Sequence, residues 1–134
     1  MEIFYQIANT FFFVFHIGLI LFNLFGWMVK PLRKWNLITL GLTAFSWFGL
    51  GFFYGFGYCF LTDWHWQIRD QLGYPTPFNS YIHFLITTLF SVSVSERWVD
   101  VLTASLFFAA LIMSILTNLR DYKKSMKSKG DGLR

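Results

Sequence analysis

The densest group of reactive side chains lies between residues 59 and 74. This segment holds a thiol, a carboxylate, an imidazole and a guanidinium, at Cys59, Asp63, His65 and Arg69. An imidazole or a carboxylate can move protons, and a guanidinium can hold an anionic group through two parallel hydrogen bonds. The residue types therefore indicate a candidate site, although they specify neither a ligand nor a reaction.

The same segment predicts a short helix over residues 63–72. Thr62 is a good N-cap, Asp63 suits the positive end of the helix dipole, and Gly73 is a good terminator. Such a helix, lying at a membrane surface, keeps charged side chains in water without any chemical role. That plain structural interpretation competes with the catalytic one.

Two further histidines lie outside this segment, at positions 16 and 83. Together with His65, and with help from Cys59 or Asp63, they could ligate haem or a metal ion, because imidazole and thiolate suit iron, copper and zinc. No two of the histidines have the spacing of a recognised metal-binding pair. The sequence therefore assigns no metal and leaves the cofactor unknown.

The elements that must position these side chains are hydrophobic helices. The 134 residues are 55% apolar and 22% aromatic. Between residues 3 and 119 the charges fall in three clusters: Lys30, Arg33 and Lys34; Asp63, Arg69 and Asp70; Glu96, Arg97 and Asp100. A bilayer core needs about 20 apolar residues of helix. The charge-free runs predict an all-α integral membrane helical bundle of four hydrophobic helices, over 8–28, 36–61, 81–94 and 101–119.

Charge predicts how many of the four helices cross the membrane. Residues 30–34 and residues 120–134 are both rich in Lys and Arg, which collect on cytoplasmic flanks. Three crossings put both segments in the cytoplasm, with the N-terminus outside and the short helix 81–94 in or dipping into the outer leaflet. Four crossings remain an alternative. We expect one transmembrane domain over 1–119 and a basic cytoplasmic tail over 120–134, with a disordered end.

Two further patterns concern packing inside the bundle. Asn9, His16 and Asn23 recur every seven residues along the first helix, which predicts a polar stripe that faces other helices. Gly51 and Gly55 have the spacing that lets two helix backbones approach closely. Both patterns are typical of helix packing, although an intramembrane histidine is also a functional candidate.

The chain also resembles a bacterial membrane family, called domain of unknown function 2784, over about residues 4–119. The residues that carry the resemblance are His16, Trp35, Trp47, Cys59, Leu61, Thr62, Arg69, Gly73, Tyr74 and Phe78. Phe60 stands where the family pattern has proline, and His65 stands where it has an acidic residue. The resemblance implies a multi-pass protein of the bacterial inner membrane, without an established activity or cofactor.

Three functions remain open. The first is an accessory or binding subunit of a membrane complex, with the lipid bilayer and other membrane subunits as partners. The second is a haem- or metal-binding redox protein. The third is a lipid-handling enzyme or transporter in which Arg69 holds an anionic group and His65 or Asp63 moves protons. The basic residues lie beside apolar runs, which favours membrane topology over nucleic-acid binding.

Overall fold

A computed structural model describes residues 1–55, 57–75 and 80–132, so Phe78 and the last two residues of the basic tail lie outside the described part. The described chain is helical, as predicted. Its helices are α1 (Glu2–Phe25), α2 (Arg33–Ala44), α3 (Gly51–Tyr54), α4 (Phe60–Gln71), α5 (Tyr81–Phe90) and α6 (Glu96–Gly132). The 3-10 turns η1 (Gly26–Met28) and η2 (Lys30–Leu32) connect α1 to α2. A π-helical stretch, η3 (Phe45–Leu50), joins α2 directly to α3.

Three stretches are long and apolar enough to cross a bilayer. They are Glu2–Met28, Lys30–Tyr54 and Glu96–Gly132, whereas α5 is a shorter apolar helix. Many large apolar side chains on the three long helices are exposed, among them Phe11, Leu42 and Leu116. Such a surface is unfavourable in water and suits a hydrocarbon environment. The prediction of three long membrane helices and one short apolar helix is confirmed.

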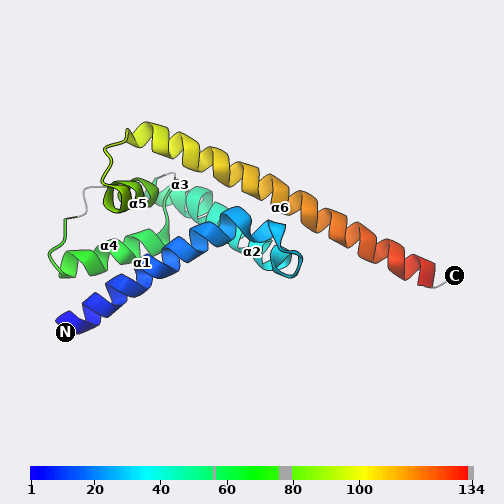
Figure 1. The fold of residues 1–134 in the computed structure, drawn as a ribbon, viewed down its shortest axis with the longest axis horizontal. Coiled ribbons are helices and arrows are strands. Elements are labelled where there is room, and N and C mark those ends of the chain that lie inside the picture. The colour runs from blue at the N-terminus through cyan, green and yellow to red at the C-terminus, as the bar shows by residue number, and fades with distance from the viewer. Residues whose placement is uncertain (56, 76–79, 133–134) are drawn as a thin grey trace.

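The short helices gather at one end of the bundle (Figure 1). α4 lies beside α1, α5 lies near the start of α6, and α6 runs from that end to the opposite one, where the C-terminus lies. One core cluster joins Leu40 of α2 to Phe107 and Ala110 of α6. The second cluster is formed by the first residues of α5 and packs against α1 and α4. We call α4 and α5, together with the α1 residues that they contact, the head.

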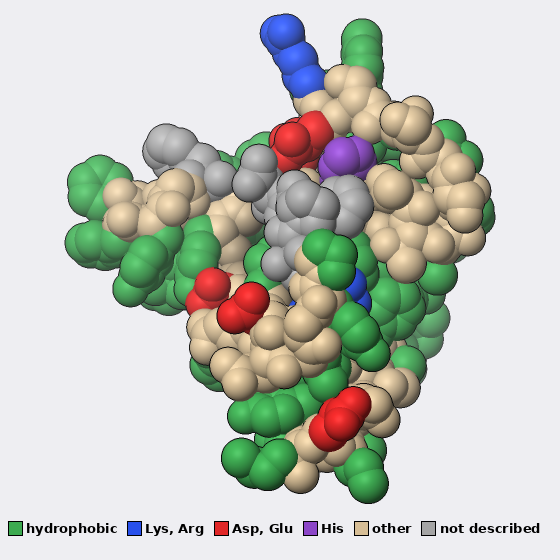
Figure 2. All heavy atoms as spheres, turned by 90° about the vertical axis from the view of Figure 1, so that its left-hand side faces the viewer, with side chains coloured by type: hydrophobic (Ala, Val, Ile, Leu, Met, Phe, Trp, Pro, Cys, Tyr) green, Lys and Arg blue, Asp and Glu red, His purple; other side chains and the backbone are tan. Residues whose placement is uncertain are grey.

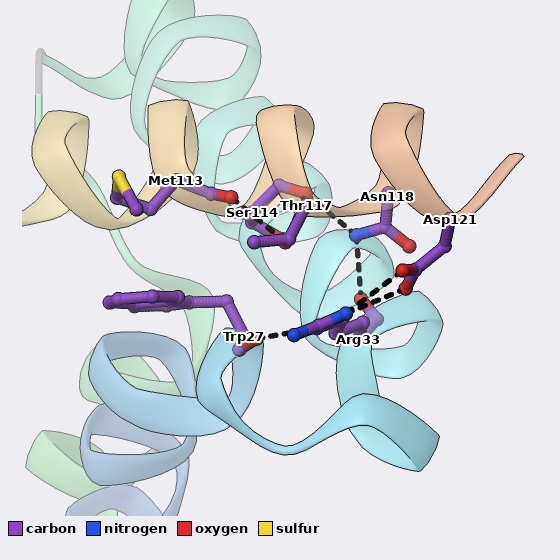
Figure 3. A network of polar contacts seen from close by, with 7 residues as sticks. All are labelled: Trp27, Arg33, Met113, Ser114, Thr117, Asn118 and Asp121. Atoms are coloured by element: carbon purple, nitrogen blue, oxygen red, sulfur yellow. Dashed lines mark hydrogen bonds and ion pairs between the residues drawn. The ribbon is translucent and has the colours of Figure 1, made fainter. Parts of the chain in front are cut away.

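At the other end, Arg33 ties the start of α2 to the charged part of α6 (Figure 3). Its Nη1 donates to both carboxylate oxygens of Asp121 at 2.9 Å, and its Nε donates to the carbonyl oxygen of Trp27 at 2.9 Å. The Asn118 amide donates to the backbone carbonyl of Arg33 at 3.0 Å. The basic turn between α1 and α2 and the basic end of α6 therefore share one end of the molecule.

Predicted boundaries of all three long helices are wrong. The first helix starts at Glu2 instead of residue 8. The second helix ends at Tyr54 instead of residue 61, because Gly55 has a φ of 114°, which ends the helix in a conformation that favours glycine. The last helix starts at Glu96 and continues to Gly132, well beyond residue 119. The Arg and Lys residues from 120 onward are good helix formers, and the helix continues through them.

The boundaries of the short helices also differ from prediction. α4 begins at Phe60 with Cys59 as its N-cap, so Thr62 is a buried residue of the first turn and not the cap. Gly73 ends α4 as predicted, with a φ of 73° and with the Tyr74 N–H donating to the carbonyl of Arg69 at 3.0 Å. α5 ends at Phe90, before residue 94, because Ser91 adopts a left-handed conformation.

The π-helical stretch η3 anchors the linker that leads to α4. The Ser46 hydroxyl donates to the carbonyl oxygen of Tyr58 at 2.9 Å. The Gly57 N–H donates to the carbonyl oxygen of Trp47 at 3.2 Å. These two bonds hold the chain against the second long helix at the point where it enters the head.

Candidate functional site

His65 lies at the centre of the head. Its side chain is fully buried. Nε2 lies 2.8 Å from Asn9 Oδ1 and Nδ1 lies 3.0 Å from the Tyr81 hydroxyl. Because an amide oxygen only accepts, the proton of a neutral ring belongs on Nε2, and the Tyr81 hydroxyl donates to Nδ1. One imidazole therefore joins α1, α4 and α5.

The surroundings of His65 favour its neutral form. Burial lowers the pKa of its imidazole to about 4, and the positive charge of Arg69 on the same helix acts in the same direction. The ring is therefore uncharged near pH 7, and both nitrogens are already hydrogen-bonded. A group in this state cannot exchange protons with a substrate unless the head opens.

Aromatic rings surround this imidazole. The Phe12 ring stacks on His65 with centroids 5.9 Å apart, and Trp66 lies at the same centroid distance. On α1, His16 stacks on Tyr81 with centroids 3.8 Å apart and an interplanar angle of 9°. The His16 side chain is buried, and its Nδ1 has no hydrogen-bond partner among the described residues. His16 and His65 thus meet through Tyr81 instead of sharing a ligand.

Arg69 lies one turn after His65 and has a different environment. Its Cζ lies 4.8 Å from the centre of the Phe84 ring and 5.3 Å from that of Tyr74. Burial lowers the pKa of its guanidinium, which nevertheless stays protonated. Nε is buried and has no hydrogen-bond partner within the described chain.

The other predicted site residues are dispersed. Asp63 is partly exposed, and its Oδ2 accepts from the Gln67 amide at 3.0 Å and from the Tyr58 hydroxyl at 3.4 Å. Cys59 is a free, partly buried thiol at the start of α4. His83, on α5, has its Nε2 2.9 Å from the carbonyl oxygen of Val94, to which it donates. These groups do not converge on one point.

The positions of the three histidines do not support the metal hypothesis. Among residues 1–55, 57–75 and 80–132, no three His, Cys, Asp or Glu side chains lie close enough to hold a metal ion. His65 uses both ring nitrogens within the head, and His83 uses one of its nitrogens at a backbone carbonyl. The three histidines therefore do not form a ligand set in this arrangement.

The polar stripe of α1 has two sets of partners. At one end, Asn9 is hydrogen-bonded to His65 of α4, and His16 stacks on Tyr81 of α5. At the other end, Asn23 Nδ2 donates to the Thr43 hydroxyl at 3.1 Å, and Asn36 Nδ2 donates to the carbonyl oxygen of Phe22 at 2.7 Å. The stripe thus holds α1 against α2 as well as against α4.

The two glycines expected at a helix contact lie in different settings. Gly51 is a buried residue of α3. Gly55 is exposed and follows the end of that helix. The structure therefore places Gly51 inside the second long helix and Gly55 just after its end, so the two do not share one continuous helix face.

Sequence reasoning did not find the link from Asn9 to His65 or the role of Tyr81. The seven-residue spacing of Asn9 and His16 showed that α1 had a polar side, but it did not show which helix that side would meet. Tyr81 was expected only as the first residue of the short apolar helix. Its position after Ser80, the N-cap of α5, was the available signal for a fixed side chain.

Comparisons with known proteins add one finding. A family model with the description "Protein of Unknown function (DUF2784)" matches residues 6–119. No curated protein matches the chain, and no solved structure matches it. The matched range includes all but the first residues of α1, the whole of α2 to α5 and the apolar part of α6.

Proposed function

The chain belongs to the family described as Protein of Unknown function (DUF2784), and from the geometry of its head we propose that it acts by binding, as a small accessory subunit of a membrane complex. The observation that carries the proposal is that His65 has no ring nitrogen left to react with a substrate. Its two nitrogens are occupied by Asn9 and Tyr81, and the side chain has no exposed surface. The central polar group of the head thus serves to fix three helices together.

A fixed head is suited to presenting a surface. On the outer side of α4, an open groove of about 450 Å³ runs between α4 and α1. Aromatic, aliphatic and amide side chains line it: Tyr5, Phe12, Trp64, Gln67, Ile68 and Gln71. Such a mixture of aromatic and uncharged polar groups is typical of protein interfaces. We take this groove as the contact surface for a partner helix.

The proposed setting is the cytoplasmic membrane of a bacterium, with the head on the outer side. The end that carries the head displays acidic side chains (Figure 2). The opposite end joins the basic turn to the basic part of α6 through Arg33 and Asp121. Because Lys and Arg favour cytoplasmic flanks, this distribution supports three crossings with the C-terminus inside.

Lipid handling is a second candidate, which Arg69 favours. A guanidinium with no acidic partner among the described residues can hold an anionic headgroup. Chemistry on that lipid would need a proton carrier beside Arg69. Both nitrogens of His65 are hydrogen-bonded, and the Asp63 carboxylate accepts from Gln67 and Tyr58.

Site-specific photo-crosslinking in native membranes tests the accessory role. A photoreactive amino acid replaces Trp64, which is 51% exposed on the groove, and the control position is Tyr122, which is 64% exposed on the charged part of α6. We expect one defined protein adduct from position 64 and none from position 122. A second groove position, Gln67, covers the case in which the Trp64 replacement disturbs the fold.

The proposal is wrong if neither groove position gives a protein adduct and the chain purified gently from native membranes carries no second protein. Lipid adducts alone at both groove positions would show that lipid, and not a partner helix, covers the groove.

A further inference from the structure

Arg69 carries a positive charge that the described chain does not neutralise. The ion pair that the structure shows joins Arg33 to Asp121, at the far end of the molecule. Arg69 Nε is buried and has no hydrogen-bond partner among the described residues. A buried donor of a charged group without a partner is costly, so an anion beside this guanidinium would be favourable.

The two rings beside Arg69 limit which ligand can bind. Phe84 and Tyr74 contact the guanidinium at 4.8 and 5.3 Å from its Cζ. Aromatic rings stabilise a cation by contact with its flat face, and they leave the N–H groups at its edge available. A guanidinium presents these donors as a planar fork, which matches two oxygens of a phosphate or a carboxylate.

The position of α4 indicates which anion reaches this fork. α4 packs on the first turns of α1, whose other side exposes Ile7, Phe11 and Val14. An apolar surface at the level of the head means that lipid borders it, and phosphate groups are the abundant oxyanions where lipid meets water.

We propose that Arg69 binds the phosphodiester of a phospholipid headgroup, with Tyr74 and Phe84 holding the guanidinium in place. This site is separate from the α1–α4 groove, because Arg69, Tyr74 and Phe84 do not line that groove. It therefore stands or falls independently of the accessory role.

The test is a titration of the full-length protein in detergent with three short-chain probes. Dihexanoyl phosphatidylglycerol supplies phosphate and tails, dihexanoylglycerol supplies tails alone, and inorganic phosphate supplies the anion alone. Binding is followed by tryptophan fluorescence, because Trp66 packs on Phe84 with centroids 5.1 Å apart, and by the increase in Tm. The variants are Arg69→Gln and, as a charge-matched control, Arg97→Gln, whose exposed side chain begins α6.

We expect phosphatidylglycerol to bind the wild type and Arg97→Gln alike, and to bind Arg69→Gln about tenfold more weakly, in line with loss of a charge-assisted pair of hydrogen bonds. Dihexanoylglycerol should show no dependence on Arg69. Equal affinity of phosphatidylglycerol for wild type and Arg69→Gln overturns the proposal. So does equal affinity of the wild type for phosphatidylglycerol and dihexanoylglycerol, a comparison that holds even if the variant fails to fold.

Inorganic phosphate separates the two sources of the anion. Weaker binding of inorganic phosphate than of phosphatidylglycerol supports a lipid headgroup. Equal or tighter binding that is lost in Arg69→Gln would overturn the headgroup assignment and identify a site for free phosphate. A further variant, Arg69→Lys, keeps the charge but lacks the planar fork, and we expect it to recover only part of the affinity.

Discussion

Arg33 and Asp121 are 88 positions apart in the sequence, and both oxygens of the carboxylate accept from the same guanidinium nitrogen at 2.9 Å. The pair joins the first residue of α2 to the part of α6 that follows its apolar stretch. It therefore brings together the two basic segments, 30–34 and 120–134, that the charge pattern predicts on one side of the membrane. A bundle in which both segments share an end is the arrangement that three crossings produce.

The proposed topology predicts which positions a membrane-impermeant thiol reagent can reach. In a Cys59→Ser background, single cysteines replace Lys34, Gln71 and Ser125 in turn. In intact spheroplasts, we expect labelling at position 71, and labelling at positions 34 and 125 only after permeabilisation. Labelling of 34 and 125 from opposite sides would instead establish four crossings.

The Arg33 side chain should contribute more to stability than its partner carboxylate. Arg33→Gln loses the bonds to Asp121 and the bond from Nε to the Trp27 carbonyl, whereas Asp121→Asn loses only the charge of one partner. We expect a larger fall in Tm for Arg33→Gln in detergent. Lys124→Gln, an exposed position on the same part of α6, is the control and should leave Tm unchanged. If Arg33→Gln and Asp121→Asn change Tm no more than Lys124→Gln does, the Arg33 network does not hold the two helices together.

Tyr81→Phe tests the junction of the head. The variant keeps the ring that stacks on His16 but removes the hydroxyl that donates to His65, which leaves a buried nitrogen without a partner. We expect a loss of about 1–2 kcal/mol in the free energy of unfolding, the usual cost of an unsatisfied buried group. Chemical denaturation in mixed micelles measures it. An unchanged free energy would mean that His65 finds another donor.

Acid should destabilise the head through His65. The folded-state pKa of this imidazole is about 4, below its ordinary value of 6.5, so the unfolded chain binds a proton first as pH falls. The stability contribution is therefore complete above about pH 6.5 and is lost as pH falls toward 4. Tm measured against pH should fall more steeply for wild type than for His65→Gln.

Gln71→Ala, an exposed change on the same helix, serves as the control for that pH series and should follow the wild-type curve. If His65→Gln shows the same slope as wild type between pH 6.5 and 4, the acid sensitivity belongs to other groups.

Gly26 marks a close contact between the turn and α2. A Cβ at this position would lie 2.8 Å from Nδ2 of Asn36, a side chain with no exposed surface and no room to move. We expect Gly26→Ala to cost about 1–3 kcal/mol, the range for overpacking. A Cβ at Gly18 meets nothing within 4 Å, so Gly18→Ala should be neutral or stabilising by up to about 1 kcal/mol. Equal Tm values for the two variants would contradict the contact.

Much of the fold could be predicted because it depends on local composition. The runs without charge located the three long helices and the short apolar one, and Gly73 located the end of α4. The end of the second long helix could not be predicted because one dihedral angle decides it. The apolar run continues past Tyr54, so hydropathy gave no reason to end the helix there, whereas the positive φ of Gly55 does.

The candidate site could be predicted only in part, because its contacts join distant segments. Asn9 and His65 are 56 positions apart, and no spacing rule relates them. The sequence identified His65 and Arg69 as neighbours on one helix, which is correct. It could not show that His65 is buried with both nitrogens hydrogen-bonded, whereas Arg69 contacts two aromatic rings. That difference depends on how α5 packs against α4.

The π-helical stretch η3 makes the number of residues in the second long helix as important as their type. Each residue of an α-helix adds about 100° of rotation, and a π-helix accommodates one residue beyond the α-helical count. Deleting one residue between 45 and 50 would therefore return this stretch to α-helical bonding with little change of phase in the helix after it. The bonds that anchor Tyr58 to Ser46 and Gly57 to Trp47 depend on the shape of this stretch. We therefore expect such a deletion to keep the membrane helices in phase and to loosen the linker that leads into the head.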